Sequence, residues 1–359
     1  MTHRGRDLEI VHHVPIGDRR IGEGQPAYIV AEAGVNHDGR LDKAMRLVEV
    51  AADAGADAVK FQVFRAADLA TGSAPTAKYQ QDHAGGDSQQ EMLEGLELSD
   101  DAFAAIRMKC VEHSIEFLAT PFAPPDLDRL LALDVRALKI ASTDLNNTPL
   151  LRAAAATGLP LIVSTGAATR DEIAVCVDLL SGLGVGDRLI LLHCVSCYPT
   201  PLEDANLRAI AGLQRAFSLP CGYSDHTVST QTGAWAVAAG ACVLEKHFTL
   251  DQTAAGPDHA MSLAPDELIE YVRSIRAAEQ ALGDGAIGLS ELESEVRRIA
   301  RKSVVAAVDI RAGSELTADL LTLKRPGGGI QPDQLESLIG RRVAVDVPGD
   351  TTLTWRMIQ

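Results

Sequence analysis

A repeating pattern of hydrophobic and polar positions organises most of the chain. Short runs rich in β-branched residues are each followed by a polar turn and then by an Ala- and Leu-rich stretch with helical spacing. The apolar runs cover residues 27–34, 56–64, 115–122, 135–142, 159–166, 188–196, 219–226 and 241–248. Because these runs are almost continuously apolar, we expect both faces of their sheet to be buried, as in parallel sheets. Eight such units in about 285 residues predict an α/β fold, a (β/α)8 TIM barrel rather than an open, doubly wound sheet.

The predicted helices alternate with these runs. They cover residues 42–54, 99–113, 125–133, 147–157, 169–182, 204–217, 229–239 and 265–282. The last one has the usual start and stop signals, with Pro265 and two acidic residues at its beginning and Gly283 directly after its end. Two segments depart from the pattern. Residues 65–98 form a polar insertion, the polar excursion, that interrupts the alternation of strands and helices. Residues 8–22 predict a short hairpin across the bottom of the barrel.

The pattern changes towards the end of the chain. The segment from 284 to 300 is polar and lacks strand alternation, so it predicts a linker with a short helix. Short β-runs and tight turns then predict a small α+β domain of about 60 residues, close to the lower size limit for independent folding. We therefore expect a barrel domain over residues 1–285, a linker over 286–300 and a small domain over 301–359.

Composition narrows the possible partners. Hydrophobic residues make up 46% and charged residues 23%, as in ordinary soluble proteins. The net charge of −16 argues against nucleic acid or an anionic membrane as a partner, although a local group of lysines can still bind a small anion. The sequence has no apolar run of membrane-spanning length and no secretory signal at its start, so we expect a cytoplasmic protein. The six cysteines are expected to be reduced, and the single C-x-x-C of Cys194 and Cys197 is weak evidence for a zinc or redox site.

Polar residues accumulate where the predicted strands end. In a barrel of this kind the active site lies at the carboxyl ends of the strands. The polar residues at or just after those ends are Glu32, Asn36, His37, Lys60, Gln62, Thr120, Lys139, Ser142, Asp144, Ser164, His193, Ser196, Tyr198, Ser224, Asp225, His226, Glu245, Lys246 and His247. A purely structural barrel would not need this accumulation, which therefore indicates a functional site.

Two lysines are predicted to face the inside of the barrel. Lys60 and Lys139 would be costly there unless each is paired with an anion. Together with the nearby hydroxyls they would form a cradle for a phosphate or a carboxylate, since charge-assisted hydrogen bonds are strong. The alternative is an internal salt bridge from each lysine to Glu32 or Asp144.

Two histidines end neighbouring strands. The imidazoles of His226 and His247 could converge on a divalent metal such as Mn²⁺, Fe²⁺ or Zn²⁺. The alternative is a pair of hydrogen-bonded core histidines, and the anion cradle beside them favours the metal. His193 and His259 are interpreted as structural or supporting residues.

A glycine-rich stretch, KRPGGGIQP at 324–332, stands out in the small domain. It is either a surface loop or a loop that delivers Arg325 to a site elsewhere, because three glycines permit close backbone approach.

Nine motifs in one order resemble a known family. They are IVAEAGVNHDG, VKFQVF, KIASTDLNN, IVSTGA, HCVSCYPTP, GYSDHT, LEKHFTLD, GPDHAMSL and LKRPGGG, spread over about residues 20–358. Together they resemble the sialic acid synthase family, the phosphoenolpyruvate-dependent nonulosonic acid synthases with an antifreeze-like (SAF) domain. The resemblance implies a TIM barrel, an SAF tail, and a homodimer in which the tail of one subunit caps the barrel of the other.

The resemblance also implies residue roles. Phosphoenolpyruvate would be bound by Lys60, Thr120, Lys139, Ser142, Ser164 and Ser224, and the metal by His226 and His247. The sugar would be bound by Gln62, Tyr198, Asp258 and, from the other subunit's tail, Arg325. Glu32 would contact both substrates, and Glu32, Asp144 or Glu245 would move protons, in an order that the sequence leaves open.

The reaction implied is the condensation of phosphoenolpyruvate with an open-chain N-acylated mannosamine-type sugar. A divalent metal, Mn²⁺ first with Mg²⁺ or Co²⁺ as alternatives, would polarise the sugar aldehyde, and phosphate would leave by C–O cleavage. The first expectation is an N-acetylneuraminate synthase. Segment 73–99 resembles that of members that make legionaminic acid, so this product is the alternative, followed by an aldol synthase acting on another aldehyde such as a sugar phosphate. A non-enzymatic, ice-binding role is disfavoured because the tail lacks a regular repeat.

Overall fold

The computed structural model describes residues 13–72, 74 and 88–359. The chain divides into two compact units, Met1–Asp284 and Gly285–Gln359, which are described separately. Most of the segment 73–99 and residues 8–12 of the predicted hairpin lie outside the described residues. Among the described residues, no helix combines the length and the hydrophobicity that crossing a membrane requires.

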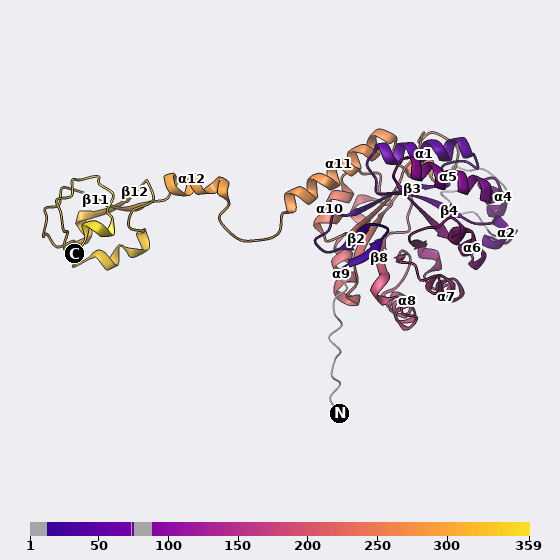
Figure 1. The fold of residues 1–359 in the computed structure, drawn as a ribbon, viewed down its shortest axis with the longest axis horizontal. Helices are drawn as coiled ribbons and strands as arrows, with labels where there is room; N and C mark the ends of the chain where they lie inside the picture. The colour runs from indigo at the N-terminus through magenta and orange to yellow at the C-terminus, as the bar shows by residue number, and fades with distance from the viewer. Residues whose placement is uncertain (1–12, 73, 75–87) are drawn as a thin grey trace, which may run out of the picture. The chain divides into compact units, whose positions relative to one another are not determined.

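Eight parallel strands, counted over the described residues, form the sheet of the first unit (Figure 1). They are β3 (Tyr28–Gly34), β4 (Ala58–Val63), β5 (Glu116–Pro121), β6 (Leu138–Ile140), β7 (Leu161–Ser164), β8 (Leu189–Cys194), β9 (Cys221–Asp225) and β10 (Val243–His247). The hydrogen-bonded order is β5-β4-β3-β10-β9-β8-β7-β6, and the end strands β5 and β6 contact each other. The sheet is therefore a nearly closed barrel, and the predicted (β/α)8 fold is confirmed.

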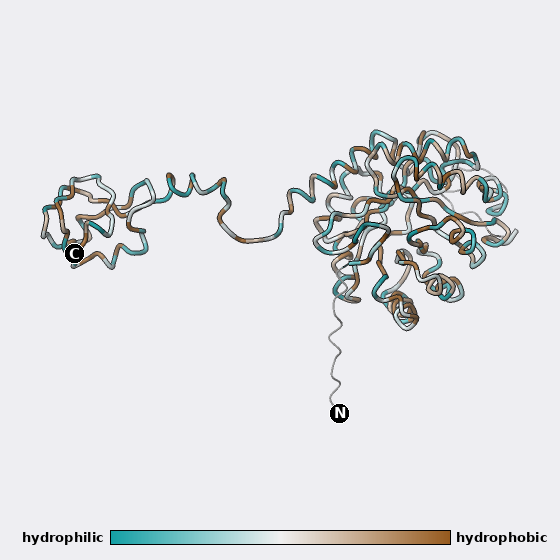
Figure 2. Tube along the Cα trace, viewed as in Figure 1, coloured by the Kyte–Doolittle hydropathy of each residue, from teal (hydrophilic) through white to brown (hydrophobic). Residues whose placement is uncertain are grey.

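Helices surround the barrel (Figure 1). They are α1 (Leu41–Asp53), α5 (Asp100–Glu112), α6 (Pro124–Ala132), α7 (Thr148–Ala156), α8 (Arg170–Gly182), α9 (Arg208–Phe217), α10 (Thr232–Ala238) and α11 (Pro265–Leu282). Hydrophobic and hydrophilic positions alternate along them (Figure 2), because each helix buries one face against the strands. Local signals set their ends: Ser99 and Thr169 accept hydrogen bonds from the first-turn amides of α5 and α8, and Pro265 opens α11.

Shorter elements fill the connections. The polar excursion contains the short helices α2 (Ala66–Leu69) and α4 (Gln89–Glu94). The 3-10 turns of this unit are η1 (Ser142–Asp144), η2 (Gly186–Arg188), η3 (Leu202–Asp204) and η4 (His259–Met261). Helix α9 begins later than the predicted residue 204, because η3 forms a separate turn before it.

The lower interior of the barrel is apolar and closed. Strands β1 (His13–Ile16) and β2 (Arg19–Gly22) form an antiparallel hairpin. Val14, Ile16 and Ile21 of this hairpin pack in one buried cluster with inward-facing strand residues. Those strand residues are Tyr28, Val30, Ala58, Leu118, Ala137, Ile162, Ile190, Leu192 and Val243. The hairpin therefore covers the amino-terminal end of the barrel.

The second unit is small and has its own core. It contains α12 (Glu291–Ala300) and the antiparallel strands β11 (Ser303–Ala306) and β12 (Leu321–Lys324). Its 3-10 turns are η5 (Ala318–Leu320), η6 (Pro332–Gln334), η7 (Glu336–Leu338) and η8 (Trp355–Met357). The buried cluster of this unit comprises Val304, Ala306, Ile310, Leu316, Leu321, Ile330, Leu338, Val343, Val347 and Leu353.

Candidate active site

A polar layer lies above the apolar interior of the barrel. Successive side chains of a strand point to opposite faces, so one residue in two faces the barrel axis. The inward-facing polar side chains, all less than a tenth exposed, are Glu32, Lys60, Thr120, Lys139, Ser164, Cys194, Ser224 and Glu245. Each of the eight strands contributes one of them, and together they form the floor of the candidate site.

Two lysines and two glutamates form an ion network in this layer. The Lys60 ammonium lies 2.9 Å from a Glu32 oxygen and 3.7 Å from a Glu245 oxygen, and it donates a 3.0 Å hydrogen bond to the Thr120 hydroxyl. The Lys139 ammonium lies 3.6 Å from the other Glu245 oxygen. The internal salt bridge considered as the alternative is therefore present for Lys60, with Glu32 as its partner. For Lys139 the partner found among the described residues is Glu245, and neither Glu32 nor Asp144 takes that place.

The network shifts the pKa values of Glu32 and Glu245 in opposite directions. Burial raises the pKa of Glu32 above its ordinary value, and Lys60 offsets this only in part. Burial acts in the same direction on Glu245, but Lys139 and Lys60, with a 2.9 Å hydrogen bond from Ser224, outweigh it and hold the pKa below its ordinary value. Glu245 is therefore the ionised partner of the lysines, and Glu32 is the carboxyl group that most readily holds a proton.

Hydroxyl groups line the same layer. The buried Ser164 hydroxyl has no hydrogen-bond partner among the described residues, so it can serve a bound molecule. The Ser142 hydroxyl accepts a 2.9 Å hydrogen bond from the Gly166 amide and lies 3.1 Å from the Cys194 sulfur. A Cβ atom on Gly166 would meet both of these side chains closer than 3.0 Å, so the loop after β7 approaches them as only glycine permits.

The two predicted metal-binding histidines lie together one layer higher. The ring centroids of His226 and His247 are 5.7 Å apart, and Tyr198 packs on His226 at 4.3 Å between ring centroids. His226 donates through Nδ1 to the Val195 carbonyl at 2.7 Å, which leaves Nε2 with a lone pair. The buried Nδ1 of His247 has no hydrogen-bond partner among the described residues. Burial lowers the pKa of both imidazoles, so both are neutral and can donate lone pairs to a cation.

Three of the predicted sugar-contacting side chains converge around Gly34. An added Cβ atom at Gly34 would lie 3.4 Å from an oxygen of Asp258, 3.4 Å from an oxygen of Glu32 and 3.5 Å from the Gln62 amide nitrogen. Gly34 has a φ of +54°, a conformation that suits glycine. Asp258 also approaches His247, with 3.8 Å between Oδ2 and Nδ1, and burial raises the pKa of Asp258 to about 6. The site therefore has a polar mouth above the lysine layer.

The acid–histidine pairs of β9 and β10 differ in orientation. Glu245 and His247 are two residues apart and therefore share a face of β10. That face is the inner one, because Glu245 bonds to Ser224 and His247 lies beside His226. Asp225 and Lys246 face the helices instead, where they form a buried 3.0 Å ion pair directly across the two strands. Asp225 is therefore a structural residue, and it contributes no carboxylate to the pair of histidines.

Comparison with known proteins now identifies the relatives of the chain. The model of the NeuB family matches residues 47–287, and that of the SAF domain matches residues 301–359. The chain belongs to the NeuB family. It is 41% identical over 342 residues to an N,N'-diacetyllegionaminic acid synthase of Legionella pneumophila, covering 94% of this chain and 96% of that protein.

Other NeuB-family relatives carry related activities. A second N,N'-diacetyllegionaminic acid synthase, from Campylobacter jejuni, is 42% identical over 315 residues, covering 87% of this chain and 94% of that one. The N-acetylneuraminate-9-phosphate synthase of Mus musculus is 37% identical, with 93% of each chain covered. Among solved structures, an N-acetylneuraminic acid (sialic acid) synthetase from Leptospira borgpetersenii matches with a TM-score of 0.70 and 36% identity, covering 79% of this chain and 94% of that one. The chain is therefore an enzyme of the sialic acid synthase type.

One residue predicted for the NeuB-type site, Asp144, does not join the cluster. Asp144 lies in η1, where it accepts a 2.8 Å hydrogen bond from Asn147, and no ion pair or hydrogen bond found among the described residues links it to the lysine layer. Arg325 is exposed and belongs to the second unit, the SAF domain.

The sequence analysis predicted no role in the site for Cys194. It placed Asn36 after a strand end without assigning it a function. Cys194 contributes its thiol to the polar layer, and strand parity is the signal that could have identified it. Asn36 donates to the Phe248 carbonyl at 2.8 Å and to the Ser262 hydroxyl at 2.9 Å. The six cysteines, all within the described residues, form no disulfide, and Cys197 is exposed while Cys194 is buried.

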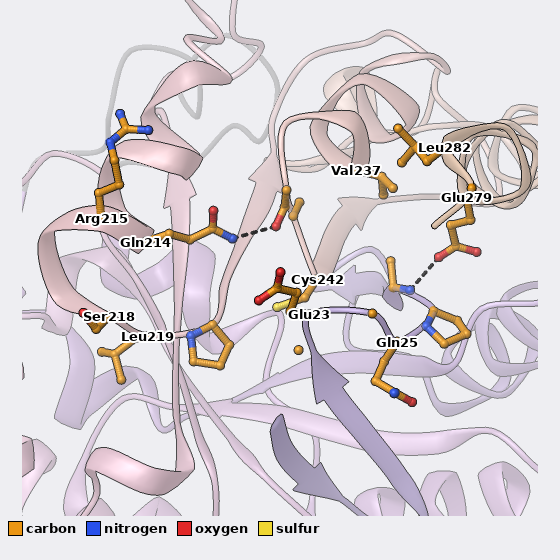
Figure 3. Close-up of a pocket in the computed structure, with 18 residues that line it drawn as sticks. Glu23, Gln25, Gln214, Arg215, Ser218, Leu219, Val237, Cys242, Glu279 and Leu282 are labelled. Carbon is orange, nitrogen blue, oxygen red and sulfur yellow. Dashed lines mark hydrogen bonds between the residues drawn. The ribbon is translucent and has the colours of Figure 1, made fainter. Parts of the chain in front are cut away.

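A separate cleft lies at the opposite end of the NeuB barrel (Figure 3). It has a volume of about 760 Å³ and is lined by residues 22–27, by segments just before β9 and β10, and by the end of α11. Two hydrogen bonds join residues of its wall: Gln214 donates to the Gly240 carbonyl at 2.8 Å, and the Ala27 amide donates to Glu279 at 2.5 Å. None of the residues predicted for the active site lines this cleft.

Proposed function

We propose that this enzyme condenses phosphoenolpyruvate with the aldehyde of an open-chain N-acylated mannosamine-type sugar. The products are a nine-carbon 2-keto-3-deoxy acid and inorganic phosphate. The observation that carries this proposal is the buried layer of Lys60 and Lys139, with the unpartnered Ser164 hydroxyl, directly below His226 and His247. A lysine layer of this kind suits an anion, and the histidines suit the polarisation of a carbonyl group.

The lysine layer is suited to the phosphoenolpyruvate end of the reaction. When Glu32 holds a proton, Lys60, Lys139 and the ionised Glu245 together carry a net positive charge. A phosphate or carboxylate then completes the charge balance, with hydroxyl donors from Ser164, Ser142, Ser224 and Thr120. Such donors are fixed before the substrate arrives, so they stabilise charge that develops in the transition state.

The bond changes follow from this placement. The C2–C3 electron pair of phosphoenolpyruvate forms a bond from C3 to the aldehyde carbon, and the aldehyde oxygen becomes a hydroxyl by taking a proton from Glu32. Water then adds to the electron-poor C2 and returns a proton to the Glu32 carboxylate. The C2–O bond to the phosphate then breaks. Phosphate leaves with that oxygen and takes the proton of the new C2 hydroxyl, so that C2 becomes the ketone. We assign the proton transfer to Glu32 because its raised pKa lets it hold and release a proton.

His226 and His247 are suited to hold a divalent metal. Two neutral imidazoles with available lone pairs fit a cation of the Mn²⁺ type. Among the described residues, no group of three or more His, Cys, Asp or Glu side chains could hold a metal, so the protein would supply two ligands. When bound there, the metal would supply Lewis-acid polarisation of the sugar aldehyde.

We propose N,N'-diacetyllegionaminic acid as the product, formed from 2,4-diacetamido-2,4,6-trideoxymannose. The two relatives with that activity are 41% and 42% identical to this chain, against 37% for the mouse N-acetylneuraminate-9-phosphate synthase. N-acetylneuraminate, the first expectation from the sequence, is the second candidate. It is supported by the Leptospira borgpetersenii sialic acid synthetase structure at 36% identity.

The test is phosphate release from phosphoenolpyruvate with Mn²⁺, comparing 2,4-diacetamido-2,4,6-trideoxymannose with N-acetylmannosamine. Preference for the first sugar would support the legionaminic acid assignment, and preference for the second would replace it with the sialic acid one. Release with a sugar phosphate alone, or with none of these aldehydes, would contradict the proposed acceptor class.

We further propose that the active form is a homodimer in which Arg325 from one subunit serves the site of the other. The support is that Arg325 is exposed and belongs to a unit with its own core. The barrel itself places Gln62 and Asp258 near Gly34 and Tyr198 beside His226. The expected cytoplasmic location stays a prediction.

A further inference from the structure

The loop after β10 (residues 249–262, the Asp258 loop) carries one carboxylate to the mouth of the site. Asp258 meets Glu32 and Gln62 around Gly34, as described above. Unlike those two residues, Asp258 is not part of a barrel strand, so hydrogen bonding of the loop must fix its position. The contacts of the neighbouring His259 supply that fixation.

His259 uses both ring nitrogens to join two loops. Its Nε2 lies 2.8 Å from an Asp38 oxygen in the loop after β3, and its Nδ1 lies 2.6 Å from the Thr249 hydroxyl. His259 as a whole is only 2% exposed. Asp38 is held in turn by an ion pair with Lys43 of helix α1. His259 therefore connects the Asp258 loop to the first helix of the barrel.

The loop backbone packs directly on the His259 ring. A Cβ atom added to Gly256 would lie 2.6 Å from the ring carbon Cδ2, so a larger residue there would have to displace the ring. A second link reinforces the first, because Asn36 donates to Ser262 at 2.9 Å and Ser262 donates to the Asp258 carbonyl at 2.6 Å. The direction of the Asp258 carboxylate thus depends on contacts between the two loops.

We propose that His259 is a positioning residue, which holds the Asp258 loop against the loop after β3 so that the Asp258 carboxylate faces the amino-sugar. Both of its ring nitrogens bond to the protein, so His259 acts through Asp258 and not on the substrate. The sugar role of Asp258 is part of the proposed function, and the inference rests on it to that extent. The lysine layer, which is proposed to bind phosphoenolpyruvate, is fixed by the strands and is independent of this loop.

The kinetic test uses the full-length enzyme with Mn²⁺, phosphoenolpyruvate and 2,4-diacetamido-2,4,6-trideoxymannose or N-acetylmannosamine, whichever the wild type accepts. His259→Ala should raise the KM for the sugar about tenfold or more, because a displacement of about 1 Å is enough for a loss of this size. The KM for phosphoenolpyruvate should stay within about twofold, since no group of the lysine layer moves. His259→Gln keeps an N–H donor for Asp38 and should recover most of the loss.

The controls separate positioning from general damage. Asp38→Ala removes the same hydrogen bond from the other side, and its effect should not add to that of His259→Ala. His193→Ala removes another buried histidine, bonded to the Ala205 carbonyl at 2.9 Å, and should leave the KM for the sugar unchanged. Equal increases in both KM values, or additive effects of the two variants, would overturn the proposal.

Hydrogen exchange tests the loop without turnover. In His259→Ala the backbone amides of residues 250–262 should exchange at least about tenfold faster than in the wild type, while those of β4 and β10 keep their rates. Unchanged exchange in the loop would refute the positioning role. If the wild type releases no phosphate with any sugar, the proposed function fails, and the exchange result still decides whether His259 holds the loop.

Discussion

Lys60 stands between two carboxylates, 2.9 Å from Glu32 and 3.7 Å from Glu245, with almost no access to water. At this scale a single replacement changes the charge of the whole layer. A buried ion pair adds little net stability, yet removing one partner leaves the other buried and uncompensated.

The first prediction separates stability from activity at Lys60. Lys60→Met should lower the free energy of unfolding by about 3–5 kcal/mol, because Glu32 loses its nearest partner. The double variant Lys60→Met/Glu32→Gln should recover most of that loss and still release no phosphate. Urea unfolding and the phosphate-release assay measure the two effects. Recovery of activity in the double variant would contradict the assigned role of Lys60.

The second prediction concerns pH and His37. Burial lowers the pKa of His37 to about 4, while its ordinary value is 6.5. Between these pH values His37 is protonated in the unfolded chain but neutral in the folded protein. The free energy of unfolding therefore decreases as pH falls below about 6.5. The contribution of His37 to the free energy of unfolding should therefore fall by about 2 kcal/mol from pH 7 to pH 5.

The measurement is a comparison of wild type and His37→Asn by urea unfolding across that range. Asn can still accept the hydrogen bond that the Gly39 amide donates to His37 Nδ1 at 3.1 Å. The difference in unfolding free energy between the two proteins should shrink or reverse towards pH 5, since only the wild type carries the penalty. A difference that stays constant with pH would show that burial does not lower the pKa of His37 in the folded protein.

The sequence could predict the site residues that lie on strands, because side chains along a strand alternate between its two faces. Residues two apart on one strand, such as Lys60 and Gln62 or Glu245 and His247, share a face, and the alternation of a strand is enough to predict this. Asp144 was included because it follows the strand β6, but η1 turns it towards Asn147 instead. The partner of Lys139 could not be predicted either, because β6 and β10 are not neighbours in the barrel and only closure of the sheet brings them together.

At the scale of elements, the spacing between strands limits which residues fit. Gly222 in β9 faces the backbone of β10, and an added Cβ atom would approach the Val243 carbonyl and the Leu192 side chain closer than 3.0 Å. Gly212 in α9 has no neighbouring atom within 4 Å of such a Cβ. The two glycines form a matched pair.

The third prediction is that alanine has opposite effects at these two positions. Gly222→Ala should lower the unfolding free energy by about 3 kcal/mol or more, because two hydrogen-bonded strands must separate. Gly212→Ala should raise it by about 0.5–1 kcal/mol, since alanine costs less entropy than glycine in a helix. Thermal or urea unfolding compares them, and losses of similar size at both sites would count against the strand packing described here.

The elements themselves were largely predictable. The eight apolar runs all contain a strand, because burial on both faces leaves a strong signal in the sequence. The loops that shape the mouth of the site were not, because contacts such as His259 to Asp38 join residues 221 positions apart. No local pattern encodes such a distant pairing.

At the scale of the whole molecule, the chain has two units with separate cores. The fourth prediction follows from the proposal that Arg325 completes the site of another subunit. Lys60→Met/Glu32→Gln and Arg325→Ala should each be inactive alone. Co-expressed in equal amounts, they should give about a quarter of the wild-type activity, because half of the dimers are mixed and one of the two sites in each is intact.

The comparison that checks it is phosphate release from the mixture against each variant alone. Activity no higher than that of the separate variants would mean that each tail serves its own barrel or none. A mixture of two barrel variants, such as His226→Ala with the double variant at Lys60 and Glu32, is the control and should stay inactive.

The hairpin of β1 and β2 covers the amino-terminal end of the barrel, so the lysine layer lies above a closed apolar floor. Along β4 and β10, Lys60 and Glu245 of the lysine layer precede Gln62 and His247 by two positions, or about 6–7 Å. Under the proposed function, phosphoenolpyruvate is therefore expected to bind before the sugar, which would cover it, and phosphate, released at the bottom, is expected to leave last.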